Sequence, residues 1–204
     1  MKKFFSALLC ALLLLGIACA EGCLPEGAQL LAEEGDERRY RVEETGEELI
    51  LSMQGESASG LRGEFAGAID ASWQEQSREG AEVALREEYP AARVLRAEET
   101  QLAGLSAWKL TFVCEEAAGW ATLLGDRIRE REVSFGAYFQ EGRLTMTGAR
   151  TVVLLYRPQA QLTEIELDED DGLWIYEGEA ILDGTEYEFE IHAETAQLLE
   201  WERD

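Results

Sequence analysis

The chain has 204 residues, with 42 acidic side chains against 18 basic ones and a formal net charge of −24 at pH 7. A polypeptide this acidic repels phosphate backbones and anionic lipid surfaces, which argues against nucleic-acid binding and favours cationic partners. Hydrophobic residues make up 46% of the chain, which is enough for a folded core and argues against disorder.

The N-terminus has the layout of a secretory signal peptide. Two lysines precede an uncharged apolar run over residues 4–17, and Ala18-Cys19-Ala20 supplies the small residues that precede a cut before Glu21. The run is shorter than the roughly 20 residues that a transmembrane helix needs. We therefore expect residues 1–20 to be a signal peptide and the remaining protein to be secreted or extracytoplasmic, without a transmembrane helix.

A lipoprotein signal overlaps with this one. Leu15-Gly16-Ile17-Ala18-Cys19 resembles a bacterial lipobox, although Gly16 stands where leucine is usual. In that case Cys19 would be acylated and would hold the protein at the cell envelope. Both interpretations stay open, and an intact mass that begins at Glu21 would exclude the lipid.

Cleavage before Glu21 would leave two cysteines, Cys23 and Cys114. An exported protein can form a disulfide between them, and the alternative is a small buried Cys114 side chain with Cys23 free. The sequence has no Cys-x-x-Cys pair and no Cys/His cluster, which excludes structural zinc. We expect no cofactor.

The segment up to Pro90 is predicted to hold a meander, a loop and a helix. Period-two alternation between glycine turns predicts strands within residues 28–54, and the glycine and serine content of residues 54–64 predicts a loop. Apolar residues that recur every three to four positions predict one long helix over residues 65–89, which Pro90 ends.

The segment between Pro90 and Pro158 is predicted to be mostly extended. The expected strands are residues 92–100, 106–114, 131–140, 143–147 and 152–156. Glu141-Gly142 is the expected hairpin turn, the fully apolar run 152–156 indicates a central strand, and residues 115–127 are ambiguous and could hold a short helix. The expected fold class is α+β, with antiparallel sheets packed by the long helix, and we assign residues 21–157 to this domain.

From residue 158 onward the chain reads as an acidic β-meander, with turns at Asp170-Asp171-Gly172 and Asp183-Gly184. Alternation places His192, the only histidine, on one strand face with three glutamates. These side chains and the acidic hairpin tip form the expected partner surface. Its residues are Asp168, Asp170, Asp171, Glu186, Glu188, Glu190 and His192.

The same segment carries a family resemblance, in Thr163-Glu164-Ile165-Glu166-Leu167, Asp170-Asp171-Gly172, Trp174 with Tyr176, residues 183–191, Ala193-Glu194-Thr195 and Leu198-Leu199-Glu200. With this pattern, residues 158–204 resemble the β part of the PepSY family. His192 replaces the usual Asp, and Ala196 replaces the usual Gly at an expected left-handed position, at a cost of about 1 kcal/mol. We expect the family's leading helix to be absent, because residues 148–161 are apolar, β-branched and interrupted by Pro158. The resemblance implies a secreted or envelope module that binds or restrains peptidases without catalysis of its own.

A second resemblance concerns layout alone. Residues 65–150 run as a helix, Tyr89-Pro90, a strand, the segment Leu102–Leu110 and a hairpin around Glu141-Gly142. This order is similar to exported α/β modules of the PsbP and Mog1 kind, which implies an adaptor or lipoprotein role.

Signals for catalysis are weak throughout. The acidic run 168–171 does not have EF-hand spacing around Gly172, and residues 55–60 lack the second glycine of a nucleophile elbow. Among 42 acids, a glycosidase-like carboxylate pair carries no specificity. We therefore expect no enzyme and no metal site, but a binding or regulatory protein whose acidic surface acts on a peptidase or a basic peptide. A secreted carboxylate-dependent hydrolase and a cation-binding envelope protein remain as alternatives.

Overall fold

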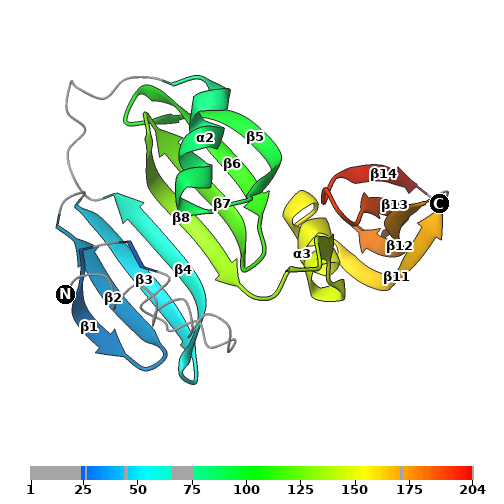
Figure 1. Cartoon of the computed structure of the whole chain (residues 1–204), viewed down its shortest axis with the longest axis horizontal. Helices are drawn as coiled ribbons and strands as arrows, with labels where there is room; N and C mark the ends of the chain where they lie inside the picture. Colours follow the sequence, from blue (N-terminus) through cyan, green and yellow to red (C-terminus); the bar gives the residue numbers. More distant parts are fainter. Residues whose placement is uncertain (1–23, 26, 44–45, 66–75, 171, 204) are drawn as a thin grey trace, which may run out of the picture. The chain divides into compact units, whose positions relative to one another are not determined.

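The computed structural model describes residues 24–25, 27–43, 46–65, 76–170 and 172–203 (Figure 1). The chain divides into two compact units, residues 1–68 and 69–204. The expected signal peptide, Cys19 and Cys23 lie outside the described residues. Among the helices that are described, none combines the length and the apolar character needed to cross a membrane.

The first unit is an antiparallel meander of four strands, each paired with the next along the chain. The strands are β1 (Ala28–Glu34), β2 (Glu37–Val42), β3 (Glu47–Gln54) and β4 (Ser57–Phe65). The alternation predicted over residues 28–54 is confirmed, because Leu49 and Leu51 are fully buried while Ile50 between them is only half-buried.

The loop predicted over residues 54–64 is wrong, because most of it is β4. The strand pairs with β3 from Ser57 to Phe65, with one register shift opposite Ser52 and Met53. The turn itself is short and is centred on Gly55, which has a φ of +66°. Glycine and serine gave no strand signal here, because the extended conformation is held by pairing with β3 and by the buried side chain of Leu61.

The second unit begins with helix α2 (Arg78–Glu88) and a four-stranded antiparallel sheet. The strands lie in the order β5 (Arg93–Leu102), β6 (Leu105–Val113), β7 (Ala117–Leu124) and β8 (Arg127–Phe135), each next to its chain neighbour. Helix α2 packs on one face of this sheet (Figure 1), where Ala81 and Leu85 meet Leu110 and Phe112. Residues 115–127, which were ambiguous in sequence, are therefore mainly strand.

The single long helix predicted over residues 65–89 is wrong in its length. Phe65 ends β4, and α2 begins only at Arg78, where the Ser77 hydroxyl caps it by accepting a hydrogen bond from the Gly80 N–H at 3.3 Å. The helix is thus 11 residues long. The end predicted from Pro90 is confirmed, because the Tyr89 N–H donates the last hydrogen bond of the helix to the Leu85 carbonyl.

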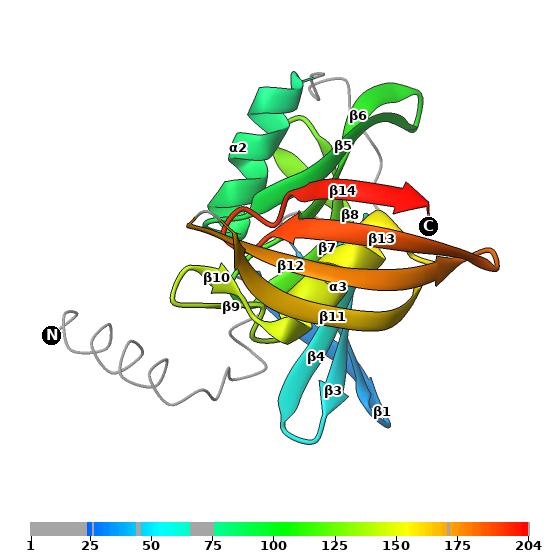
Figure 2. The same ribbon diagram turned by 90° about the vertical axis from the view of Figure 1, so that its right-hand side faces the viewer.

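The rest of the second unit is a short hairpin, a helix and a second four-stranded sheet. The hairpin consists of β9 (Phe139–Gln140) and β10 (Arg143–Leu144), and α3 (Met146–Tyr156) follows it. The sheet is a meander in the order β11 (Gln161–Asp170), β12 (Leu173–Leu182), β13 (Thr185–His192) and β14 (Leu198–Arg203). Figure 2 shows α3 lying along one face of this sheet.

Helix α3 corrects two expectations, a central strand at residues 152–156 and the absence of a helix before the acidic meander. The Thr145 hydroxyl caps the helix by accepting from the Gly148 N–H at 3.0 Å. Val152 and Val153 are fully buried in a cluster that contains Phe189 of β13 and also Val113 of β6. Apolar neighbours from two sheets bury one side of the helix, while Thr147 and Arg150 lie on its exposed side. Pro158 lies beyond its last residue, where proline is common.

Candidate functional site

Each strand of the β11–β14 sheet contains a pair of glutamates separated by one residue, and β13 adds a third at Glu186. These pairs are Glu164 and Glu166 on β11, Glu177 and Glu179 on β12, Glu188 and Glu190 on β13, and Glu200 and Glu202 on β14. Because side chains alternate between the two faces of a strand, both members of a pair lie on the same face. The residues between them lie on the opposite face, where Ile165 and Phe189 are buried in the same cluster as residues of α3.

The strand register aligns the eight glutamates in two straight rows. The first row is Glu164, Glu179, Glu188 and Glu202, and the second row is Glu166, Glu177, Glu190 and Glu200. We call this surface the glutamate face. It includes a shallow hollow of ≈ 310 Å³ lined by seven of these glutamates together with Gly178 and Phe189.

Within each row, carboxylates on neighbouring strands stand directly opposite one another. Such positions have Cβ atoms about 4.5–5.5 Å apart, and like charges placed there destabilise a sheet. The opposite face compensates with apolar burial, because Phe189 and Ile191 are at most 1% exposed. Trp201 adds ring stacking, with its centroid 6.0 Å from that of Phe189 and 5.2 Å from that of Tyr187. The sheet is thus stabilised by apolar packing on the helix side and presents carboxylates of like charge on the glutamate face.

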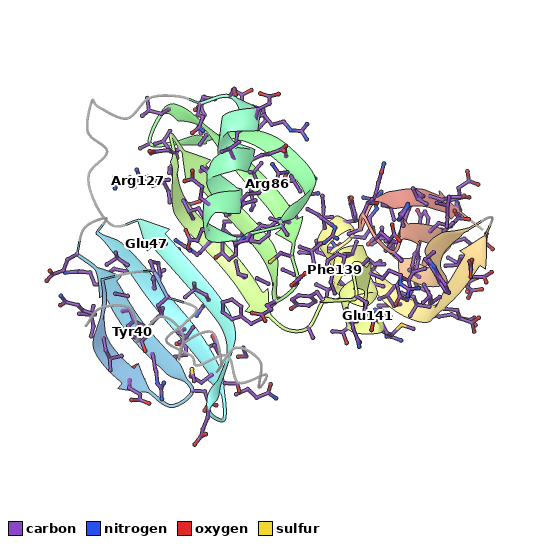
Figure 3. The ribbon with its side chains drawn as sticks, in the orientation of Figure 1. Tyr40, Glu47, Arg86, Arg127, Phe139 and Glu141 are labelled. Atoms are coloured by element: carbon purple, nitrogen blue, oxygen red, sulfur yellow. The ribbon has the colours of Figure 1, made fainter. Side chains whose placement is uncertain are left out.

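Basic side chains of this region lie on the helix side of the sheet. The Arg143 guanidinium is 4.5 Å from the ring centroid of Trp174, and the Arg157 guanidinium is 5.1 Å from that of Trp201. Arg93 of β5 lies 3.8 Å above the ring of Phe139, which comes from the β9–β10 hairpin and is labelled in Figure 3. These cation–π contacts hold positive charge away from the glutamate face and so sharpen the asymmetry of the sheet.

The structure brings together part of the partner surface expected from the sequence. Glu188 and Glu190 lie in the two rows, while Glu186 and His192 extend the same face of β13 opposite Ile181 and Ile175. Asp168 stands on the same face of β11, also opposite Ile175. The side chain of Asp170 and the whole of Asp171 lie outside the described residues.

Sequence reasoning missed six members of the two rows. They are Glu164, Glu166, Glu177, Glu179, Glu200 and Glu202. The signal that could have found them is the recurrence of Glu-x-Glu in every strand of the meander. What the sequence could not supply is the register, which turns four separate pairs into two continuous rows.

The two family departures have structural explanations. The Nδ1 atom of His192 accepts a hydrogen bond from the Glu194 N–H at 3.2 Å, which is the contact that an Asp side chain makes two residues ahead in an Asx turn. Ala196 has a φ of +60° and is fully buried. The left-handed position expected for Ala196 is therefore confirmed, and the strain is held by the surrounding core.

Metal and thiol chemistry find little support in the described part of the chain. It contains no group of three or more His, Cys, Asp or Glu side chains placed to hold a metal ion. Cys114 is buried, and burial raises the pKa of its thiol, which disfavours the reactive thiolate. Since Cys23 lies outside the described residues, a Cys23–Cys114 disulfide stays a prediction, as does acylation of Cys19.

Comparison with known proteins identifies the C-terminal region. Residues 143–202 match the PepSY family, described as "Peptidase propeptide and YPEB domain". The resemblance inferred from residues 158–204 is therefore confirmed, and the match begins earlier, so that it includes β10 and α3. No curated protein matches the chain.

Two solved structures show distant similarity. The C-terminal domain of YpeB from Bacillus megaterium is 12% identical, with a TM-score of 0.36 over 90% of this chain and 95% of that chain. A candidate lipoprotein from Clostridium difficile 630 is 13% identical, with a TM-score of 0.29 over 61% of this chain and 90% of that chain. At these scores neither structure decides the arrangement or the function of this protein.

Proposed function

We propose, from the premise that residues 143–202 form a PepSY domain, that this chain is a non-enzymatic regulatory protein that works outside the cytoplasm. The name of the family associates it with peptidase propeptides, and a propeptide acts by binding its enzyme. The chain would act in the same manner, as a ligand of a peptidase or of a basic peptide.

The glutamate face is the observation that carries this proposal. Eight carboxylates in two rows form a strongly negative surface on a rigid sheet. Complementary charge steers a partner to such a surface, raises the association rate and fixes its orientation. Because like charges opposite one another cost stability, a cationic partner would also relieve a strain that the isolated sheet carries.

The test measures peptidase activity in an extracytoplasmic extract of the producing organism, with increasing amounts of the purified chain. We expect a dose-dependent change in activity that is lost when the two central strands are neutralised in the variant E177Q/E179Q/E188Q/E190Q. These substitutions leave the core untouched. Deletion of residues 158–204 would be a poorer test, since it would expose the cluster that α3 shares with β6 and β7.

A matched control removes the same number of charges elsewhere. Four exposed glutamates outside the PepSY domain serve this purpose, namely Glu56, Glu64, Glu87 and Glu132. If the chain at saturation leaves every peptidase unaffected, or if control and variant behave alike, the proposal is wrong. Turnover of any substrate by the purified chain that a single substitution abolishes would contradict the non-enzymatic assignment.

A further inference from the structure

Strand β11 forms one edge of the PepSY sheet, and among the described residues no strand pairs with its outer side. Its register with β12 is uninterrupted over seven residues, from Glu164 to Asp170. The opposite edge, β14, keeps an uninterrupted register over only four residues, Glu200 to Arg203. The backbone groups on the free side of β11 are therefore the longer template for an additional strand.

From Glu164 to Asp168 the side chains of β11 alternate in chemistry as well as in direction, before Glu169 places a carboxylate on the other face. Glu164, Glu166 and Asp168 lie on the same face as the two glutamate rows, and all three are exposed. On the other face Ile165 is buried, while Leu167 is 41% exposed. An added strand would find carboxylates beside every second residue and an apolar surface beside the residues between them.

A second copy of this chain is a poor occupant of the edge. Pairing β11 with another β11 would place carboxylates of one copy beside carboxylates of the other, and like charges on adjacent strands repel. Charged side chains on an edge strand are a known means of preventing self-association. The same charges attract a strand with the opposite pattern.

We propose that the free edge of β11 binds an extended peptide segment in which basic and apolar residues alternate, as a fifth strand of the sheet. The inference rests on the proposed function and specifies the partner's chemistry and its position. Main-chain hydrogen bonds to β11 provide affinity, and side chains at alternate positions provide specificity. Lysine or arginine side chains extend the glutamate rows by one position with the opposite charge, and the apolar side chains cover Leu167.

The test measures binding of a fluorescent eight-residue peptide of alternating lysine and valine to the full chain by fluorescence anisotropy. We expect saturable binding that weakens with salt. The variant E164Q/E166Q should bind about fivefold more weakly, because exposed ion pairs each contribute a modest factor. The matched control E87Q/E132Q, with the same charge change at exposed positions outside this sheet, should bind as the parent does.

Two altered peptides separate strand addition from simple charge attraction. One has the same composition with the lysines in one block, and the other keeps the alternation but is N-methylated at every second residue, which removes hydrogen-bond donors from one edge. Both should lose binding at least tenfold. Equal binding of all three peptides, or equal weakening by the two double variants, would overturn the edge site while leaving the peptidase assay of the proposed function unaffected. Absence of any binding to the alternating peptide would overturn it as well.

Discussion

Helix propensity and the packing of α3 predict opposite changes in stability for the substitution Gly148→Ala. Gly148 lies buried in the first turn of α3, and its N–H bonds to the Thr145 hydroxyl. On propensity alone, alanine at this position would stabilise the helix by about 1 kcal/mol. In the structure, however, an alanine Cβ would lie 2.1 Å from the carbonyl oxygen of Tyr138 and 3.0 Å from Cδ2 of Leu144.

The magnitude follows from what the methyl group would meet. The nearest obstacle is a backbone oxygen, which cannot rotate away, and it also accepts the Thr145 N–H at 2.9 Å. Overpacking a core costs about 1–3 kcal/mol, and a rigid obstacle places Gly148→Ala at the upper end of that range. After the gain in propensity, we expect a net loss of about 2 kcal/mol in the free energy of unfolding.

The matched control is Gly80→Ala in α2. An alanine Cβ there would come within 2.3 Å of Nε2 and 2.6 Å of Cγ of Gln76. These atoms belong to a side chain, which can change rotamer where a backbone carbonyl cannot, so we expect the gain in propensity to offset the clash and the stability to stay within about 1 kcal/mol of the parent. Urea unfolding followed by tryptophan fluorescence measures both variants, and Gly148→Ala should lower the midpoint by about 1 M. A Gly148→Ala protein as stable as the parent would refute the packing of α3 described above.

Three further predictions concern the PepSY sheet. Tyr176→Phe should lower the free energy of unfolding by about 1 kcal/mol, because the buried Tyr176 hydroxyl donates a hydrogen bond to the Leu144 carbonyl at 2.9 Å. Tyr187→Phe is the control, since the Tyr187 ring is stacked on Trp201. Equal losses of stability in urea would contradict the role assigned to the Tyr176 hydrogen bond. Burial also raises the pKa of Tyr176 above its ordinary value of 10.0, so Tyr176 ionises at a lower pH in the unfolded chain than in the folded one. The stability that the neutral Tyr176 contributes should be complete below pH 10 and should be lost as pH rises through the higher folded pKa. Alkaline unfolding curves of Tyr176→Phe should lack this loss. Finally, added NaCl should raise the melting temperature, because salt screens the repulsion between the glutamate rows. The rise should be smaller in the variant E177Q/E179Q than in the parent. An identical rise in both proteins would argue against repulsion on that face.

The parts of the fold that the sequence predicts well are those set by local chemistry. The turns at residues 170–172 and at Asp183-Gly184 fall where the strands of the meander end, because Gly172, Asp183 and Gly184 all adopt the positive φ that such turns require. Pro90 marks the end of α2 for an equally local reason, the missing N–H of its ring.

The parts that the sequence does not predict depend on distant neighbours. Val152 and Val153 belong to a β-branched run that favours a strand in isolation, and their helical state is decided by the Thr145 cap and by apolar surfaces from other elements. Gly119 shows the same limit in β7, since a Cβ there would lie 2.1 Å from the Glu132 carbonyl oxygen. No local signal reports that close approach of β8.

The candidate site divides in the same manner. Alternation within β13 is local, and so it places Glu188, Glu190 and His192 on one face correctly. The rows across the sheet depend on the register of all four strands, including the shifts in β11 and β13–β14. A one-residue change in any register would move that strand's glutamates to the other face, and composition alone cannot exclude it.

The cluster that α3 shares with the preceding sheet bears on how this PepSY domain could be transplanted. Leu95, Val113 and Ala118 come from β5, β6 and β7, outside the family match, yet they pack in the same cluster as Phe189 and Ile191. A graft of residues 143–202 onto another scaffold would leave the apolar side of α3 without the side chains that cover it here. The borders of the family match are therefore not the borders of a portable folding unit, and a chimera would have to bring a substitute for those three side chains.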